Sequence, residues 1–102
     1  MDDVRITLAV AQMLRVFYED PDRDWYGYDL MSATGFASGK IYPILARLTT
    51  AGWLLPLDPG PESKSGGSPR ISYRLAPEAV SRVARELTVI DRSIRLPRPP
   101  PA

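Results

Sequence analysis

SGKIYPILARLTTAGWL, residues 38–54, is the stretch of sequence that decides the fold. Its apolar residues recur at intervals of three and four, the spacing that places them along one side of a helix. The apolar stripe consists of Ile41, Ile44, Leu45 and Leu48. The other side carries Lys40, Pro43 and Arg47, flanked by Tyr42 and Ala46, and the segment contains no acid. We therefore predict a helix that buries one side and presents basic, aromatic and small groups on the other.

Three positions set the limits and shape of this helix. Ser38 is predicted to be the N-cap, because its hydroxyl can accept a hydrogen bond from the first turn. Pro43 would clash with the carbonyl four residues earlier, which belongs to Gly39, the most compliant residue type. We therefore expect the helix to continue through Pro43 with a slight bend and to end at Gly52.

Two helices are expected before it. Apolar spacing predicts the first over residues 4–18, and Pro21 would stop it. The second is short, follows Trp25-Tyr26-Gly27 and ends at Gly35, where a left-handed residue is favoured. The acidic residues 19–24 between them are expected to form a solvated loop.

Two strands are expected after it. Residues 53–58 and 71–75 are predicted to pair as an antiparallel hairpin. Alternation in the second strand predicts that its odd-numbered residues, from Ile71 to Leu75, face the core. Nine of the thirteen residues 58–70 are Gly, Pro or Ser, so this segment is expected to form a long hairpin tip.

A last helix is expected to begin at Pro77, a residue that suits the first helical position. Its apolar residues form a seam with alternating spacings of three and four: Val80, Val83, Leu87, Ile90 and Ile94. We predict that this seam, with Ile6 and Val10 of the first helix, forms a dimer interface. The alternative is that the seam packs on the chain's own first helix. Residues 96–102 are proline-rich and are expected to form a disordered or polyproline tail.

Composition narrows the classes of protein that the sequence can encode. The chain has 102 residues, 44% hydrophobic and 25% charged, which suits one small domain. It contains no Cys and no His, which argues against disulfides, thiolate chemistry and the usual general base. No apolar run is long enough for a membrane span, and the acidic start argues against a secretory signal. We expect a cytoplasmic protein that is not an enzyme and needs no cofactor or metal.

The net charge of +1 conceals an asymmetry along the chain. Residues 1–36 carry a net charge of −4, whereas residues 37–75 carry +3 and residues 76–102 carry +2. A basic middle segment beside an acidic first segment creates a directional field, which matters more to a polyanion than the total charge. The major groove of DNA is wide enough to accept the predicted basic helix.

Four motifs resemble those of the PadR family of bacterial transcription regulators. Tyr26-Gly27-Tyr28-Asp29-Leu30 is similar to the family's G-Y-(D/E)-L, and residues 38–48 are similar to its S-x-G-T-(L/V)-Y-P-x-L-x-R-L. Ala51-Gly52-Trp53-Leu54 follows, and after the loop Arg70-Ile71-Ser72-Tyr73-Arg74-Leu75 is similar to R-K-Y-Y-R-L. The resemblance covers residues 4–90.

The resemblance implies a winged helix-turn-helix, mainly α with a small β-hairpin, followed by a C-terminal dimerisation helix. Residues 1–76 would form the DNA-binding domain, residues 77–95 the dimerisation helix and residues 96–102 the tail. It also implies a homodimeric regulator, most often a repressor, that binds a palindromic operator in double-stranded DNA. Lys40 departs from the family, which has a small hydroxyl residue there, and Ala76-Pro77-Glu78-Ala79 stands in place of T-x-E-G.

The predicted DNA-binding residues lie on the central helix and at the hairpin tip. Lys40 is near the helix start and is expected to reach a base edge, whereas Arg47 would reach phosphate. Tyr42 would donate its hydroxyl to a phosphate unless its ring packs on the hairpin. Ser38 and Gly39 offer backbone N–H groups to an anion. The full predicted set is Ser38, Gly39, Lys40, Tyr42, Pro43, Arg47, Lys64, Ser65 and Arg70.

Two alternative functions remain open at this point. One is a winged-helix module that binds proteins and never contacts nucleic acid, against which the basic middle segment argues. The other is a ligand-sensing regulator, because some PadR proteins bind flat aromatic or cationic drugs between subunits. The last predicted helix carries no aromatic residue that could stack on such a ligand.

Overall fold

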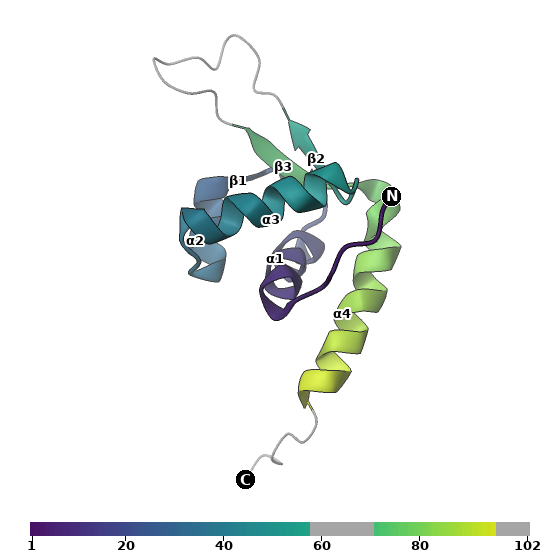
Figure 1. Cartoon of the computed structure of the whole chain (residues 1–102). Coiled ribbons are helices and arrows are strands. Elements are labelled where there is room, and N and C mark those ends of the chain that lie inside the picture. Colours follow the sequence, from purple (N-terminus) through teal and green to yellow (C-terminus); the bar gives the residue numbers. More distant parts are fainter. Residues whose placement is uncertain (58–70, 96–102) are drawn as a thin grey trace, which may run out of the picture.

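The structure is a computed structural model that describes residues 1–57 and 71–95, so the predicted hairpin tip and proline-rich tail lie outside it. Figure 1 shows the order of the elements, which confirms the predicted fold class, mainly α with a small antiparallel sheet. The elements are α1 (Leu8–Glu19), β1 (Trp25–Tyr26), α2 (Gly27–Thr34), α3 (Ser38–Thr50), β2 (Leu54–Leu57), β3 (Ser72–Leu75), the 3₁₀ turn η2 (Pro77–Ala79) and α4 (Val80–Arg95).

β3 lies in the middle of a three-stranded antiparallel sheet with the order β1-β3-β2. On one side it pairs with β2, Leu54 opposite Leu75 and Leu57 opposite Ser72, which confirms the expected hairpin. On the other side it pairs with β1, Trp25 opposite Tyr73. The sequence did not predict β1, because two residues are too few to show an alternating pattern.

The core lies between α1, α2, α3 and the sheet, and α4 packs across α1 (Figure 1). The apolar stripe predicted for α3 is buried as expected. Gly35 and Gly52 end α2 and α3 in the left-handed region, with φ of 77° and 87°. The largest fully buried side chains are Trp53, Phe17, Met13, Leu14, Leu30, Ile41, Leu45, Leu48, Leu54, Leu75, Val10 and Val83.

The first helix begins at Leu8, so the predicted start at residue 4 is wrong. Thr7 is the N-cap, and its Oγ1 accepts a hydrogen bond of 3.2 Å from the backbone N–H of Val10. Residues 1–7 form an extended segment, here named the N-terminal strap. Its Asp2 N–H donates to the carbonyl of Ala51 at 2.8 Å. This long-range contact holds the strap against the end of α3. The local apolar pattern had instead predicted that residues 4–7 belong to the first helix.

Two local details of the expected elements also differ. Ala37, not Ser38, is the N-cap of α3, and Ser38 is the first helical residue. Pro43 lies inside α3 and the helix continues through it, as predicted. In β3 the predicted alternation holds only in part. Leu75 is buried and Tyr73 packs partly on the core, as expected, but Ser72 is buried as well, and Ile71 precedes the strand and is 44% exposed.

The apolar seam of α4 packs on the chain's own α1. Val83 and Leu87 are buried in the core, and Val80 and Ile90 are partly buried against it. An ion pair between Arg15 and Asp91 also joins α1 to α4. This is the alternative that the sequence left open. The two other residues predicted at a dimer interface, Val10 of α1 and Ile6 of the strap, belong to the same packing, since Val10 is buried and Ile6 packs on the core. Ile94 lies on α4.

Candidate nucleic-acid interface

The outward face of α3 is exposed along the whole helix, and none of its 13 residues is acidic. The exposed residues are Ser38, Gly39, Lys40, Tyr42, Pro43, Ala46, Arg47 and Thr50. This set includes every site residue that the sequence predicted on this helix. The structure therefore brings these residues to one surface. Whether they bind DNA stays a prediction.

The start of α3 leaves backbone donors open. The cap residue Ala37 offers no side-chain hydrogen bond. Its carbonyl accepts from the N–H groups of Lys40 and Ile41, at 3.0 and 3.1 Å. The N–H groups of Ser38 and Gly39 precede these bonds and lie at an exposed helix end, where the helix dipole favours an anion.

Lys40 extends from this end of the helix over an aromatic ring. Its Nζ lies 4.3 Å from the centroid of the Phe36 ring, within range of a cation–π contact. Among the described residues Lys40 has no acidic partner. Phe36 packs partly on the core and thereby limits where the ammonium group can move. The Lys40 ammonium group is thus held in place by Phe36, and no acidic side chain among the described residues neutralises its charge.

Tyr42 lies across the start of α2. A Cβ placed on Gly27 would come within 2.3 Å of the Tyr42 hydroxyl oxygen and within 2.8 Å of Cζ. The ring can occupy this position only because residue 27 has no side chain. Half of Tyr42 remains exposed, at 50%. The ring thus packs on α2 and still presents surface to solvent.

Tyr73 of β3 belongs to the same group of side chains. Burial raises the pKa of the Tyr73 phenol, and the nearby Tyr42 phenol raises it further. Tyr42 of α3 is therefore close enough to Tyr73 of β3 to influence the ionisation of its phenol. Gly27 and Tyr42 both lie in motifs that resemble those of the PadR family, but no local pattern in the sequence predicts that the two residues contact each other.

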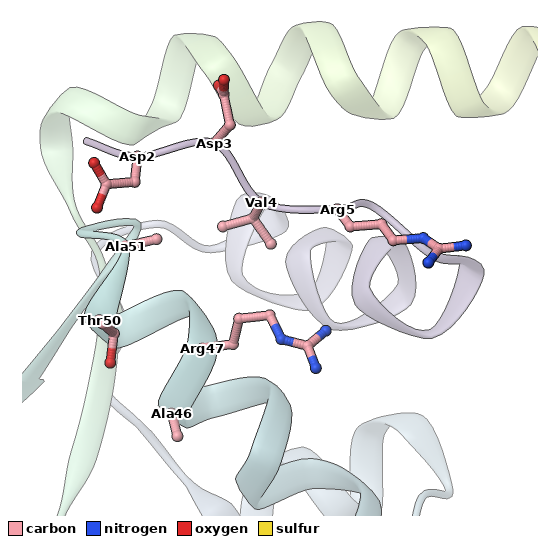
Figure 2. A pocket seen from close by; sticks show the side chains of 8 residues that line it. All are labelled: Asp2, Asp3, Val4, Arg5, Ala46, Arg47, Thr50 and Ala51. Atoms are coloured by element: carbon pink, nitrogen blue, oxygen red, sulfur yellow. The ribbon is translucent and has the colours of Figure 1, made fainter.

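Arg47 faces a shallow groove between α3 and the N-terminal strap (Figure 2). The groove has a volume of about 510 Å³ and is lined by Asp2, Asp3, Val4, Arg5, Ala46, Arg47, Thr50 and Ala51. In Figure 2 the guanidinium groups of Arg5 and Arg47 extend to the same side. Arg5 was not predicted as a site residue, because residues 4–18 were expected to form the first helix.

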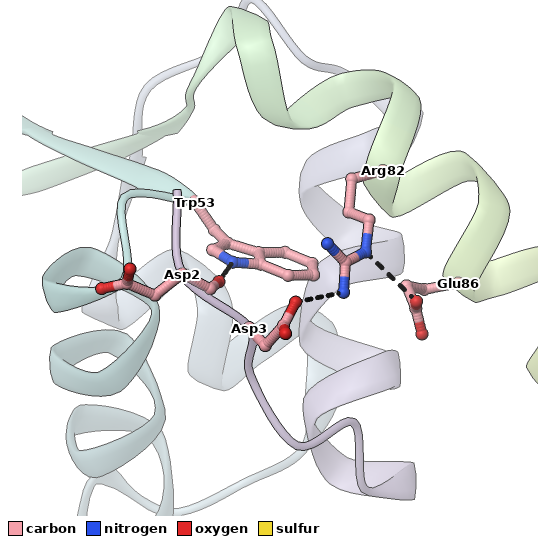
Figure 3. A network of polar contacts seen from close by, with 5 residues as sticks. All are labelled: Asp2, Asp3, Trp53, Arg82 and Glu86. Carbon is pink, nitrogen blue, oxygen red and sulfur yellow. Dashed lines mark hydrogen bonds and ion pairs between the residues drawn. The ribbon is translucent and has the colours of Figure 1, made fainter.

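A network of polar contacts fixes the strap that carries Arg5 (Figure 3). The indole N–H of Trp53 donates to the carbonyl of Asp2 at 2.6 Å. The Arg82 guanidinium of α4 donates to Asp3 at 2.8 Å and to Glu86 at 3.3 Å. The hydrogen bond with Asp3, followed by that with Glu86, raises the pKa of Arg82. The strap is therefore tied to both α3 and α4.

The predicted contacts of the hairpin tip cannot be placed in the same way, because Lys64, Ser65 and Arg70 lie outside the described residues. Arg74 of β3 is described, and it pairs with Asp24 at 2.6 Å. The charge of Arg74 is thus partly compensated, in contrast to Lys40. At the start of α2, Tyr28 is 76% exposed and adds an aromatic side chain to the surface.

Residues 1–57 and 71–95 contain no group of three or more side chains that could hold a metal ion. Among their helices, none has both the length and the apolar character needed to cross a bilayer.

Three solved structures share the arrangement of helices and strands described above. A PadR-like transcription factor from Bacteroides fragilis gives a TM-score of 0.65 at 19% identity, covering 87% of this chain and 84% of that one. A PadR family transcription regulator from Clostridium difficile gives 0.63 at 16% identity, covering 88% and 97%. NadR in complex with 4-hydroxyphenylacetate gives 0.62 at 22% identity, covering 88% and 61%.

These similarities show that the chain has the winged helix-turn-helix fold of PadR-like transcription regulators. The chain spans only 61% of the length of NadR. No protein-family model and no curated protein matches the sequence. The similarity to these solved structures therefore establishes the fold alone.

Proposed function

We propose that this protein is a DNA-binding transcription regulator that inserts α3 into the major groove of duplex DNA. The observation that carries the proposal is the outward face of α3, which is exposed, free of acids and bears Lys40 and Arg47. A helix of this kind fits the width of the major groove. The fold shared with PadR-like regulators supports the same function.

The residues of α3 divide into two roles. Lys40 lies in the first turn, from which recognition helices contact base edges, and it is proposed to read a base. Arg47 lies two turns later and is proposed to contact phosphate. The open N–H groups of Ser38 and Gly39 suit a phosphate at the helix start, and the Tyr42 hydroxyl can donate to a second one. Pro43 and the hairpin-tip residues Lys64, Ser65 and Arg70 complete the proposed contact set.

The regulator is proposed to act as a homodimer through α4. One side of α4 is buried on α1, but on another side Val89 is 58% exposed beside a shallow cavity. In Figure 1 the C-terminal half of α4 extends beyond the other elements and so offers surface to a second copy. A two-fold axis would place two α3 helices on half-sites about 34–36 Å apart, which implies a palindromic operator.

A repressor acting in the cytoplasm is the form of regulation that we propose, because the resemblance to PadR regulators favours it. A small-molecule effector bound between subunits is a second candidate. NadR, a longer protein with the same fold, is known in complex with 4-hydroxyphenylacetate. Screening such aromatic acids by the fluorescence of Trp25 and Trp53 tests this candidate.

The experiment that tests the main proposal has two steps. Duplexes bound by the full chain are first selected from a random pool. Fluorescence anisotropy at low salt then gives the affinity for the selected duplex and for a scrambled one. We expect Lys40→Ala to weaken binding of the selected duplex by about 1–3 kcal/mol and to leave the scrambled duplex nearly unaffected.

The control is Arg23→Gln, which removes an exposed cation from the loop between α1 and β1, outside both the proposed DNA contacts and the exposed side of α4. It should not change the preference for the selected duplex. Equal loss on both duplexes for Lys40→Ala would refute base reading. Failure of the wild-type chain to bind any duplex at low salt would refute the proposed function and favour a protein-interaction module.

A further inference from the structure

The N-terminal strap displays Arg5 in a fixed direction. Within the strap the half-buried Val4 and Ile6 pack on the core, whereas Arg5 and Thr7 are exposed. This is the alternation of an extended chain, in which successive side chains point to opposite sides. The strap is anchored by Asp2, through the carbonyl of Ala51 and the indole of Trp53. Arg5 is therefore held outward by an ordered backbone.

The groove beside Arg5 carries two uncompensated positive charges. Neither Arg5 nor Arg47 forms an ion pair with any residue that the structure describes. The two acids that line the same groove do not offset them. The Asp3 carboxylate is bound to Arg82, and the Asp2 carboxylate points away from both guanidinium groups in Figure 2. The groove thus presents guanidinium donors from two different segments to an anion.

The position of this groove relative to Lys40 fits the dimensions of DNA. Arg47 lies seven residues after Lys40, which corresponds to about 10 Å along the helix axis. The major groove is about 12 Å wide, so a helix with Lys40 at the base edges brings Arg47 close to a bordering backbone. Arg5 lies on the side of Arg47 that faces the strap and extends this contact beyond the helix.

We infer that Arg5 and Arg47 together bind the phosphodiester backbone of the duplex, so that the N-terminal strap is a part of the DNA interface. This inference rests on the proposed function and adds to it a contact outside the helix-turn-helix and the hairpin. Guanidinium groups bind phosphate oxygens in a planar, bidentate geometry, which suits two arginines that share one groove. Such a contact positions the protein and carries no sequence preference.

The test compares the salt dependence of DNA binding for the wild-type chain, Arg5→Gln and Arg23→Gln. Each variant removes one exposed arginine, from the strap or from the loop between α1 and β1. Affinities for the selected and scrambled duplexes are measured by anisotropy between about 50 mM and about 200 mM chloride. Each lost phosphate contact reduces the magnitude of the slope of log affinity against log salt by about 0.9. Over this range of salt, the variant should therefore lose about three- to four-fold less affinity than the wild type.

We expect Arg5→Gln to show this smaller loss on both duplexes, with the preference for the selected duplex unchanged. Arg23→Gln should match the wild type. If Arg5→Gln behaves like Arg23→Gln while the wild-type chain binds DNA, the inference is wrong and the proposed function stands. If the wild-type chain binds no duplex, both fail together.

A second arm separates backbone phosphate from free phosphate. Inorganic phosphate replaces chloride at matched ionic strength, and the difference in affinity between the wild type and Arg5→Gln is measured again. We expect the difference to persist, because the helix and the duplex hold the backbone phosphate in place. Its disappearance would show that the groove takes a free anion in preference to DNA.

Discussion

Tyr42 of α3 occupies the space that a side chain at position 27 of α2 would need. The distance from the Tyr42 hydroxyl oxygen to a Cβ built on Gly27 would be only 2.3 Å. The start of α2 and the middle of α3 are thereby in close contact at this one point. The contact also orients a tyrosine that lies on the proposed DNA-binding face.

The first prediction concerns this pair of residues. Gly27→Ala should push the half-exposed Tyr42 ring into solvent and destabilise the chain by about 1 kcal/mol. In a Tyr42→Ala background the same change should be neutral or stabilising, because alanine is favoured over glycine in a helix by up to about 1 kcal/mol. Urea unfolding of the four variants gives the coupling between the two positions. An equal effect in both backgrounds would contradict the packing described.

The second prediction concerns alkaline pH. Burial, and then Tyr42, raise the pKa of Tyr73 above its ordinary value of 10.0, so the folded chain holds this proton more tightly than the unfolded chain. The resulting stability is fully present below the unfolded-state pKa and is lost as the pH rises through the folded-state pKa. Urea unfolding from about pH 8 to about pH 11 should show this decline in the wild type and a smaller one in Tyr73→Phe. Tyr18→Phe removes an exposed tyrosine and should decline like the wild type.

The third prediction concerns the anchor of the N-terminal strap. Trp53→Phe removes the indole N–H that donates to Asp2 and leaves that carbonyl without its donor, at a cost of about 1–3 kcal/mol. Trp25→Phe is the matched change, because the Trp25 N–H is buried and has no hydrogen-bond partner among the described residues. Chemical unfolding should show a larger loss for Trp53→Phe. A larger loss for Trp25→Phe would argue against the role given to the strap.

The fourth prediction concerns the oligomeric state. Sedimentation of the full chain should give twice the mass of one chain, and Val89→Asp on the exposed side of α4 should shift the equilibrium towards monomer. The reason is that a carboxylate buried at an interface without a partner is costly. Leu55→Asp places the same charge on an exposed residue of β2 and should leave the dimer intact. A wild-type monomer at all accessible concentrations would rule out the proposed dimer.

Local periodicity was sufficient to predict the helices that carry the interface. The stripe from Ile41 to Leu48 is buried because the helical period alone determines which side faces the core. Gly35 and Gly52 mark helix ends for an equally local reason, since both adopt positive φ. The outward positions of Lys40 and Arg47 follow from the same period.

Features that depend on distant residues were not predictable in this way. The strap forms because Asp2 bonds to Ala51 and Trp53, some fifty positions away in the sequence, and no local pattern reports this. The contact between Gly27 and Tyr42 is equally non-local. The apolar seam of α4 was predictable as a seam, but the same pattern suits packing on α1 or on a second chain. Only the structure shows that α4 packs on α1 and that Val83 and Leu87 are buried in the core.

The central claim is that the outward face of α3 contacts duplex DNA, and an NMR titration tests it most directly. The ¹⁵N-labelled full chain is titrated with the selected duplex, and amide shift changes are mapped onto the described elements. We predict the largest changes in residues 38–47, with smaller ones at Arg5 and none at Arg23 in the loop between α1 and β1. Changes that spare residues 38–47 while the duplex binds elsewhere would contradict the account.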